Sequence, residues 1–295
     1  MFRGVFPAII TPFKDDGSLD EDGLRRNVEI LSKTGISGIV PCGTTGESAT
    51  LSHEEHKRVV EIVIDCSEVP VVAGTGSNNT SEAIDLTRHA ADAGADAALL
   101  ITPYYNRPNE RGLVEHFKKV AESAEIPIVL YNVPKRTGVD LRPEIVARLA
   151  EISNIVAVKE ASGSLTQVSR IIELTSGKDF SVLSGDDDLT LPMLALGATG
   201  VVSVVANVAP RATVEMVEAF LKGDIAKARE LHYRLAPLVR AMFLETNPIP
   251  VKTAYRMMGM AAGPLRLPLA PMSEENEAKL RDVLTKMSDL TGDMR

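Results

Sequence analysis

Short runs of apolar residues alternate along the chain with segments whose apolar residues recur every three to four positions. Eight of these runs consist largely of aliphatic residues without polar alternation, which is typical of strands buried on both faces. They are Val5–Ile10, Gly38–Cys42, Pro70–Thr75, Ala97–Thr102, Pro127–Asn132, Ile155–Lys159, Phe180–Gly185 and Gly200–Val205. The helical segments between them are Asp20–Lys33, His53–Cys66, Ser81–Ala93, Glu110–Ser123, Pro143–Ile152 and Leu165–Thr175.

Strands that alternate with helices predict right-handed crossovers and a parallel sheet. Eight such units favour a closed α/β structure, the (β/α)8 TIM barrel. Gly35, Gly94 and Gly197 each end a predicted helix just before a strand, as a left-handed helix cap requires. An open doubly wound sheet is the alternative, but it calls for a glycine-rich turn after the first strand, where this chain has Thr11-Pro12-Phe13-Lys14.

The chain beyond Val205 contains only helical patterns. A helix near Arg211–Lys222 completes the predicted barrel, and three more patterns follow after Gly223. These are Ile225–Phe243, Pro250–Met260 and Ser273–Leu290. We therefore predict a catalytic barrel over residues 1–223 and a C-terminal helical extension over residues 224–295, which serves packing or assembly.

Composition narrows the functional classes. The chain has 295 residues, of which 44% are hydrophobic and 24% are charged, as in ordinary globular proteins. Its net charge of −8 and the lack of a basic run argue against nucleic-acid binding. Two cysteines, no secretory signal and no apolar run of about 20 residues predict a cytoplasmic protein that binds no membrane.

Lys159 ends one predicted strand, and the active sites of such barrels lie at the C-terminal ends of the strands. Desolvation in the barrel mouth favours the neutral amine, which is the form that attacks a carbonyl carbon. The position therefore suggests a nucleophile that forms a Schiff base. A lysine paired with a carboxylate, such as Glu160 or Asp186, is the structural alternative.

Other strand ends offer partners for this chemistry. Tyr131 ends the neighbouring strand and is placed to relay protons, although a half-buried strand tyrosine would show the same pattern. The turn Gly43-Thr44-Thr45-Gly46-Glu47 supplies backbone donors and two hydroxyls, which suit a carboxylate. Arg136, between Pro134 and Gly138, would either clamp a second carboxylate or form a surface ion pair.

No metal or organic cofactor is predicted. The five histidines do not have the spacing of a metal motif, although His53 and His56 share one helix face. The run Asp186-Asp187-Asp188 lies where a helix N-cap and first turn favour acids, an interpretation that we prefer to a magnesium site. Cys42 is interpreted as a small core residue.

Three motifs together resemble the pyruvate-dependent class I aldolase family, which includes the N-acetylneuraminate lyases. They are Gly43-Thr44-Thr45-Gly46-Glu47, Tyr131-Asn132-Val133-Pro134 with Arg136-Thr137-Gly138, and Val158-Lys159-Glu160. The resemblance covers essentially the whole chain and is greatest to the dihydrodipicolinate synthase branch. It implies a TIM barrel with a helical extension, assembled as a homotetramer of two tight dimers. It also implies the condensation of pyruvate with L-aspartate 4-semialdehyde in lysine and diaminopimelate biosynthesis.

The resemblance assigns a role to each matching residue. Lys159 forms the Schiff base with pyruvate, and Arg136 holds the carboxylate of the semialdehyde. The proton relay consists of Tyr131, Thr44 and Tyr105, the last of which reaches across the tight-dimer interface into the neighbouring site. The pyruvate carboxylate and its pocket are assigned to Thr45, Gly185 and Val202.

The resemblance also predicts regulation by lysine. In synthases that free lysine inhibits, the effector binds at the tight-dimer interface. The matching positions here are Ser48, Ala49, His53, His56, Asn78, Glu82 and Tyr104. All fit the lysine-sensitive pattern, with Glu82 available to the α-amine, so we expect feedback inhibition by lysine.

Two other functions stay open at this point. Another pyruvate-dependent aldolase or lyase would act on a sugar acid or a hydroxy-oxo acid, but a fixed cation at Arg136 favours an acceptor that carries a carboxylate. A non-catalytic barrel that binds small oxo acids, or acts as a scaffold, has no need of Lys159, Tyr131 and Thr44 together.

Overall fold

The computed structural model describes residues 2–292 and divides into two compact units. Unit 1 comprises residues 72–202 together with the N-terminal residues up to Arg3. Unit 2 comprises residues 4–71 and the chain from Ser203 onward. Each unit is therefore built from two separate stretches of sequence.

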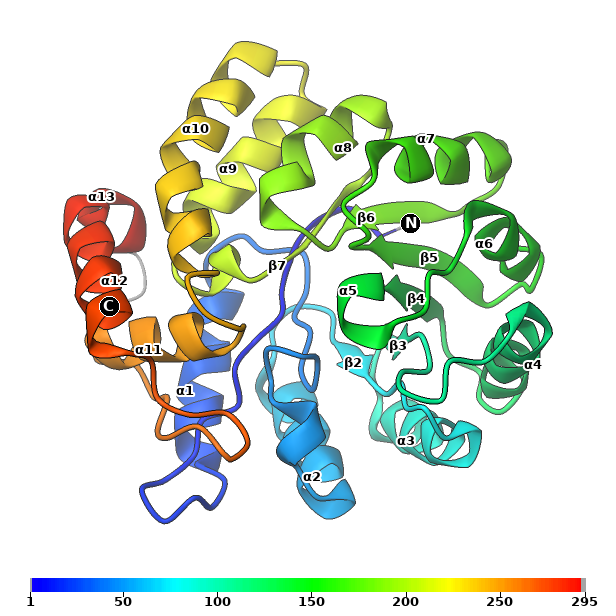
Figure 1. The fold of residues 1–295 in the computed structure, drawn as a ribbon, viewed down its shortest axis with the longest axis horizontal. Coiled ribbons are helices and arrows are strands. Elements are labelled where there is room, and N and C mark those ends of the chain that lie inside the picture. The colour runs from blue at the N-terminus through cyan, green and yellow to red at the C-terminus, as the bar shows by residue number, and fades with distance from the viewer. Residues whose placement is uncertain (1, 293–295) are drawn as a thin grey trace. The chain divides into compact units, whose positions relative to one another are not determined.

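Unit 1 is a parallel sheet whose strands are paired in chain order (Figure 1). Its strands are β2 (Val72–Gly74), β3 (Ala97–Ile101), β4 (Ile128–Asn132), β5 (Ile155–Glu160), β6 (Ser181–Ser184) and β7 (Gly200–Ser203). The helices that connect them are α3 (Thr80–Ala93), α4 (Glu110–Ala121), α5 (Pro134–Thr137), α6 (Pro143–Leu149), α7 (Leu165–Leu174) and α8 (Thr190–Leu196). The strand–helix alternation and the parallel pairing predicted from the sequence are thus confirmed.

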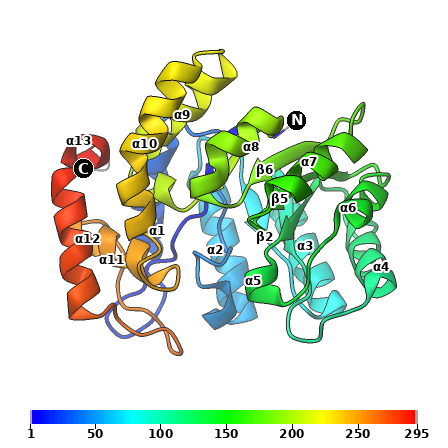
Figure 2. The same cartoon turned by 45° about the horizontal axis from the view of Figure 1, so that its top comes forward.

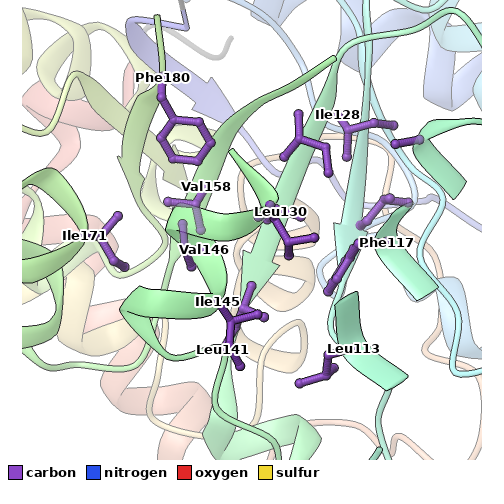
Figure 3. Packing of buried hydrophobic residues seen from close by; sticks show 14 of the residues in the cluster. Leu113, Phe117, Ile128, Leu130, Leu141, Ile145, Val146, Val158, Ile171 and Phe180 are labelled. Carbon is purple, nitrogen blue, oxygen red and sulfur yellow. The ribbon is translucent and has the colours of Figure 1, made fainter. Parts of the chain in front are cut away.

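The core of unit 1 lies between these helices and the sheet (Figure 3). Phe117 of α4 and Ile171 of α7 are fully buried against aliphatic side chains of the strands, among them Leu130 and Val158. Burying one such side chain contributes about 1.5–3 kcal/mol. The continuous apolar runs of the strands thus produce a sheet that helices cover.

Unit 2 contains one strand, β1 (Gly4–Pro7), and helices drawn from both ends of the chain. The helices are α1 (Glu21–Ser32), α2 (His53–Cys66), α9 (Pro210–Leu221), α10 (Ile225–Ala241), α11 (Ile249–Met257), α12 (Glu274–Lys286) and α13 (Ser288–Thr291). Helix α10 packs on α9 and α12 (Figure 2), and α11 packs on α12. None of the helices within residues 2–292 is long and apolar enough to cross a membrane.

The predicted strand Gly38–Cys42 is not a regular strand. Its residues make two isolated parallel bridges, Ala8↔Val40 and Ile39↔Val71. The backbone leaves the extended conformation at Cys42, whose φ of 53° lies in the left-handed region. Eight full strands and closure into a barrel therefore stay predictions, as does the domain boundary after residue 223, whereas the parallel α/β class is confirmed.

One irregularity in the sheet matters for the site. The pairing of β4 with β5 begins at Ile128↔Ile155 and continues at Val129↔Ala157, so the register shifts by one residue. Val156 is the extra residue, and it is half-buried between buried neighbours. Such a bulge moves every later pair along the strand by one position.

Candidate active site

Lys159 and Tyr131 lie side by side at the C-terminal ends of two neighbouring strands. The register pairs Tyr131 of β4 with Lys159 of β5. The Lys159 Nζ atom lies 4.1 Å from the centroid of the Tyr131 ring, and each residue is only 7% exposed. Within the described chain, neither Glu160 nor Asp186 forms an ion pair with Lys159. The position therefore holds a buried primary amine against an aromatic ring and not the carboxylate-paired lysine of the structural alternative.

Gly185 follows β6 and makes room for the lysine side chain. A Cβ atom at this position would lie 2.8 Å from the Cβ of Ala161 and 3.1 Å from the Cε of Lys159. The Gly185 N–H donates to the carbonyl oxygen of Glu160 at 2.8 Å, which fixes the close approach. Gly185 thus borders the Lys159 side chain directly. The second predicted pocket residue, Val202, is buried in β7.

Asn132 ties together the strand end beside Lys159. Its amide nitrogen donates to Asp140 at 2.8 Å and to Glu160 at 3.0 Å, and its amide oxygen accepts the Leu141 N–H at 2.9 Å. Burial raises the pKa of Glu160, while hydrogen bonds from Ser162 and Asn132 oppose that rise. Sequence reasoning did not assign Asn132 a role. Its place inside the Tyr131-Asn132-Val133-Pro134 motif is the feature of the sequence that could have indicated a role.

Arg136 lies on the one-turn helix α5, which begins at Pro134 and ends at Gly138 with a φ of 70°. Its side chain is exposed. The side chain of Arg107 approaches Gly138, with its Cδ and Nε atoms 3.6 Å from where a Cβ would lie. The proline at the first position and the left-handed glycine at the end thus define the one-turn helix that carries Arg136.

The Tyr104–Tyr105 pair lies on an exposed loop of unit 1. Tyr105 is 91% exposed and has a φ of 68°, a conformation that residues with a side chain rarely adopt. The loop is held by the amide of Asn78, which donates to the Tyr104 carbonyl at 3.2 Å, and by the amide of Asn106, which donates to the Asn78 carbonyl at 2.9 Å. Glu82 accepts a hydrogen bond at 2.8 Å from the hydroxyl of Ser77, the residue that precedes Asn78.

In unit 2, the turn that carries Thr44 and Thr45 lies between two residues with left-handed backbone. Cys42 and Glu47 both have a φ of 53°. The hydroxyl of Thr11 donates to the Gly46 carbonyl at 2.7 Å. Thr45 is buried, and its Oγ1 atom accepts a hydrogen bond from the side-chain amide of Asn247 at 3.0 Å. Two distant segments thus hold a turn that belongs to no strand or helix.

A buried ion pair anchors the end of the same turn. The Lys252 Nζ atom of α11 lies 2.5 Å from the Glu47 Oε1 atom, and both side chains are almost fully buried. The backbone N–H of Arg266 donates to the other Glu47 oxygen at 3.1 Å. Breaking a buried pair by removing one partner typically costs about 3–5 kcal/mol. Burial lowers the pKa of Lys252 to about 8, and the attraction of Glu47 opposes this shift.

The remaining predicted residues of unit 2 lie on the segment that follows the turn. Ser48 and Ala49 form part of a short 3-10 helix, Ser48–Thr50. His53 is exposed at the start of α2, and His56 is buried one turn later. The thiol of Cys42 donates to the His56 carbonyl at 3.6 Å, and burial raises the pKa of that thiol. Cys42 is therefore a core residue, as predicted.

The acidic run after β6 behaves as a helix start. The Asp186 side chain accepts the Asp188 N–H at 3.2 Å and caps the short helix Asp187–Leu189. Burial raises the pKa of Asp186. No group of three or more possible ligand side chains that could hold a metal ion occurs within residues 2–292.

Known proteins match this chain over nearly its full length. Residues 1–287 match the model of the Dihydrodipicolinate synthetase family. A curated 4-hydroxy-tetrahydrodipicolinate synthase of Methanothrix thermoacetophila is 91% identical over 295 residues, which is 100% of both chains.

Solved structures agree with this match. The structure of dihydrodipicolinate synthase from Aquifex aeolicus has a TM-score of 0.95 at 50% identity, and the alignment covers 98% of this chain and 99% of the other. A structure of the enzyme from Cyanidioschyzon merolae with lysine bound has a TM-score of 0.95 at 41% identity, with coverage of 97% and 98%.

Proposed function

Because the chain belongs to the dihydrodipicolinate synthetase family, we propose that it condenses pyruvate with L-aspartate 4-semialdehyde to give 4-hydroxy-tetrahydrodipicolinate. The observation that carries the proposal is the buried Lys159 amine beside Tyr131 at adjacent strand ends. A primary amine held away from water and free of a carboxylate partner is suited to attack a carbonyl carbon.

The reaction begins when the Lys159 Nζ atom attacks the keto carbon of pyruvate. Loss of water gives an imine, and loss of a proton from the methyl carbon gives an enamine. The enamine carbon forms a bond to the aldehyde carbon of the semialdehyde, whose oxygen takes up a proton. The amine of the semialdehyde then attacks the imine carbon, which closes the ring and releases Lys159.

The proposed supporting roles follow the family resemblance. Tyr131, Thr44 and Tyr105 move the protons, and the Tyr131 ring lies against the Lys159 amine. Arg136 binds the carboxylate of the semialdehyde. Thr45, Gly185 and Val202 receive pyruvate. Asn247 donates to the Thr45 oxygen, so the threonine hydroxyl keeps its own proton to donate to a carboxylate.

We further propose that the eight β/α repeats close into a barrel and that the chain assembles as a homotetramer of two tight dimers. The 91% exposure of Tyr105 supports a role in a neighbouring subunit's site. Mixing Lys159→Ala and Tyr105→Phe subunits after dissociation and reassembly tests that role. Activity is expected to return in the mixture, because the Tyr105→Phe subunit keeps Lys159 and receives Tyr105 from its partner. A mixture as inactive as the two parents would contradict it.

The imine itself is tested by reduction with borohydride. The protein is incubated with pyruvate, reduced and weighed intact, and the modified peptide is identified. We expect a mass gain equal to one reduced pyruvate imine on the peptide that contains Lys159. Lys159→Met is the matched control and is expected to gain no mass, although it keeps the second buried lysine, Lys252. No gain in the folded wild-type protein would remove the imine mechanism.

The acceptor is tested separately. We expect a rate with L-aspartate 4-semialdehyde and none with polyhydroxy aldehydes. Arg136→Ala is expected to raise KM for the semialdehyde while pyruvate trapping on Lys159 stays unchanged. A preference for the polyhydroxy aldehydes would assign the chain to the lyases of sugar acids.

Feedback inhibition by lysine is also proposed, supported by the relative that was solved with lysine bound. The proposed contacts are Ser48, Ala49, His53, His56, Asn78, Glu82 and Tyr104. Titration of L-lysine into the assay is expected to lower the rate, and Glu82→Gln is expected to weaken that effect. An unchanged rate at millimolar L-lysine would contradict this part of the proposal.

A further inference from the structure

The C-terminal extension contacts the Thr44–Thr45 turn through two buried polar side chains. Lys252 of α11 is paired with Glu47, the residue that ends the turn, although the two lie 205 positions apart in the chain. Asn247 precedes α11 and donates to Thr45 within the turn itself. Each contact is buried and polar, so each constrains direction as well as distance.

The buried charges around Glu47 are balanced and interlinked. Glu47 receives Lys252 on one oxygen and the Arg266 N–H on the other. The Arg266 guanidinium in turn forms a two-point pair with Glu55 at 2.5 and 2.7 Å. The Lys252 Nζ and Arg266 Cζ atoms each lie 4.0 Å from the centroid of the Phe13 ring. Two carboxylates and two cations thus form one network, and Glu47 is the residue of the turn that belongs to it.

Besides these contacts, the turn is held by the Thr11 hydroxyl, which donates to the Gly46 carbonyl, and by backbone hydrogen bonds within the turn itself. Its backbone enters and leaves through left-handed residues, Cys42 and Glu47, neither of which is a glycine. Such a conformation costs of the order of 1–2 kcal/mol per residue and persists where surrounding contacts determine it. The Glu47 carboxylate is the one charged group of the segment 43–47, and it is the group that the extension binds.

We infer that Lys252 is a positioning residue for catalysis, which acts through Glu47 to set the Thr44 and Thr45 hydroxyls, with Asn247 as its second contact. The extension on this view is part of the catalytic apparatus rather than an element of packing alone. The kinetic part of the inference rests on the proposed function. The structural part concerns the turn only and holds or fails independently.

The structural part is tested by hydrogen–deuterium exchange of the peptide that covers residues 42–50. We expect Lys252→Met to raise exchange in this peptide about tenfold or more, while peptides of β4 and β5 stay protected. The matched control is Arg256→Met, which removes an exposed cation from the same helix, paired only with the surface residue Glu277. Unchanged exchange at residues 42–50 in Lys252→Met would overturn the inference.

The kinetic part is measured per active site, counted as Lys159 sites that borohydride traps with pyruvate at saturation. A displacement of reacting groups by about 1 Å lowers rates about 100-fold, so we expect Lys252→Met to lower kcat per trapped site about 10- to 100-fold and to raise KM for pyruvate. Arg256→Met is expected to keep both constants. A purely structural role would reduce the number of trapped sites and leave kcat per site and KM unchanged, which would contradict the inference.

A double variant keeps the test decisive if Lys252→Met does not fold. Glu47→Gln with Lys252→Met removes both charges, so no unpaired buried ion remains. We expect this protein to fold and still to show faster exchange at residues 42–50 and a lower kcat per trapped site. Wild-type exchange at residues 42–50 together with a wild-type kcat per trapped site would overturn the inference. If the wild-type protein traps no pyruvate, the proposed function fails, and the exchange experiment alone decides the positioning role.

Discussion

The two units hold their candidate residues by different physical means. In unit 1, Lys159 and Tyr131 are neighbours because parallel strands pair residue by residue, and backbone hydrogen bonds set their level. In unit 2, Thr44 and Thr45 lie on a turn that buried side chains from distant positions hold, chiefly Lys252. Backbone hydrogen bonds between strands persist after most single substitutions, whereas a side-chain contact is lost when the one residue that makes it is replaced. The difference teaches that the turn is the more fragile of the two.

The largest effect is expected from removing the amine in unit 1. Lys159→Met is expected to lower kcat/KM at least about 10,000-fold, because no imine forms without the nucleophile. The free energy of unfolding is expected to stay the same or rise, since a buried amine without an ion-pair partner is replaced by an apolar side chain of similar length. Rate assays and chemical denaturation measure the two quantities. A residual rate close to that of the wild-type protein would contradict the first expectation, and a lower free energy of unfolding would contradict the second.

Tyr131→Phe tests the second member of the strand pair. The ring that contacts Lys159 is kept and only the hydroxyl is lost, so we expect kcat to fall about 100- to 1,000-fold. Pyruvate trapping at saturation and thermal stability are expected to persist. A kcat within threefold of wild type would show that the tyrosine is a packing residue.

Gly263→Ala breaks unit 2 at a point where the extension closes on Phe13. The glycine has a φ of 68°, and an added Cβ would lie 1.6 Å from the Phe13 carbonyl oxygen, so the two segments must separate. We expect the free energy of unfolding to fall by about 3 kcal/mol or more. Gly17→Ala is the control, with a φ of 83° and nothing within 4 Å, and is expected to cost about 1 kcal/mol. Equal costs for both would contradict the close approach. Denaturant titration measures them.

The smallest expected effect is the pH dependence of the free energy of unfolding that a histidine of unit 1 contributes. Burial lowers the pKa of His116 to about 4, from 6.5 when exposed, and its Nδ1 atom lies 2.9 Å from the Thr80 hydroxyl. Between these values the unfolded chain binds the proton and the folded chain does not, so stability is lost as pH falls from 6.5 to 4. The loss is on the order of 2 kcal/mol.

His116→Gln removes this titration. Its free energy of unfolding is expected to depend less on pH over the same range than that of the wild-type protein, as measured by denaturation at several pH values. Parallel pH curves for the two proteins would show that His116 contributes nothing to the dependence.

Local patterns in the sequence predict much of the fold. The helix His53–Cys66 has the predicted bounds, because a capping Ser52 and a regular apolar face define it locally. Gly94 and Gly197 adopt the predicted left-handed caps. These features depend on residues near one another in the chain.

Features that depend on distant residues were not predicted. Nothing near Lys252 indicates a partner 205 positions away, and α11 has the pattern of an ordinary amphipathic helix. The role of Asn132 as a donor to two carboxylates likewise depends on how the loop to Asp140 folds back. Hydrophobic periodicity reports which face is buried, and it does not report which polar groups meet there.

The extra residue at Val156 has a consequence for how this chain can change over generations. Regular pairing continued from Ile128↔Ile155 without a bulge would bring Val158 level with Tyr131 and turn Lys159 to the opposite face of the sheet, whereas deletion of Val156 would remove the bulge and keep Lys159 level with Tyr131. Loss of one residue at this point is therefore compatible with the observed level of Lys159, whereas straightening of the full-length strand is not. The bulge at Val156 is thus what a β5 strand of this length needs in order to present Lys159 beside Tyr131.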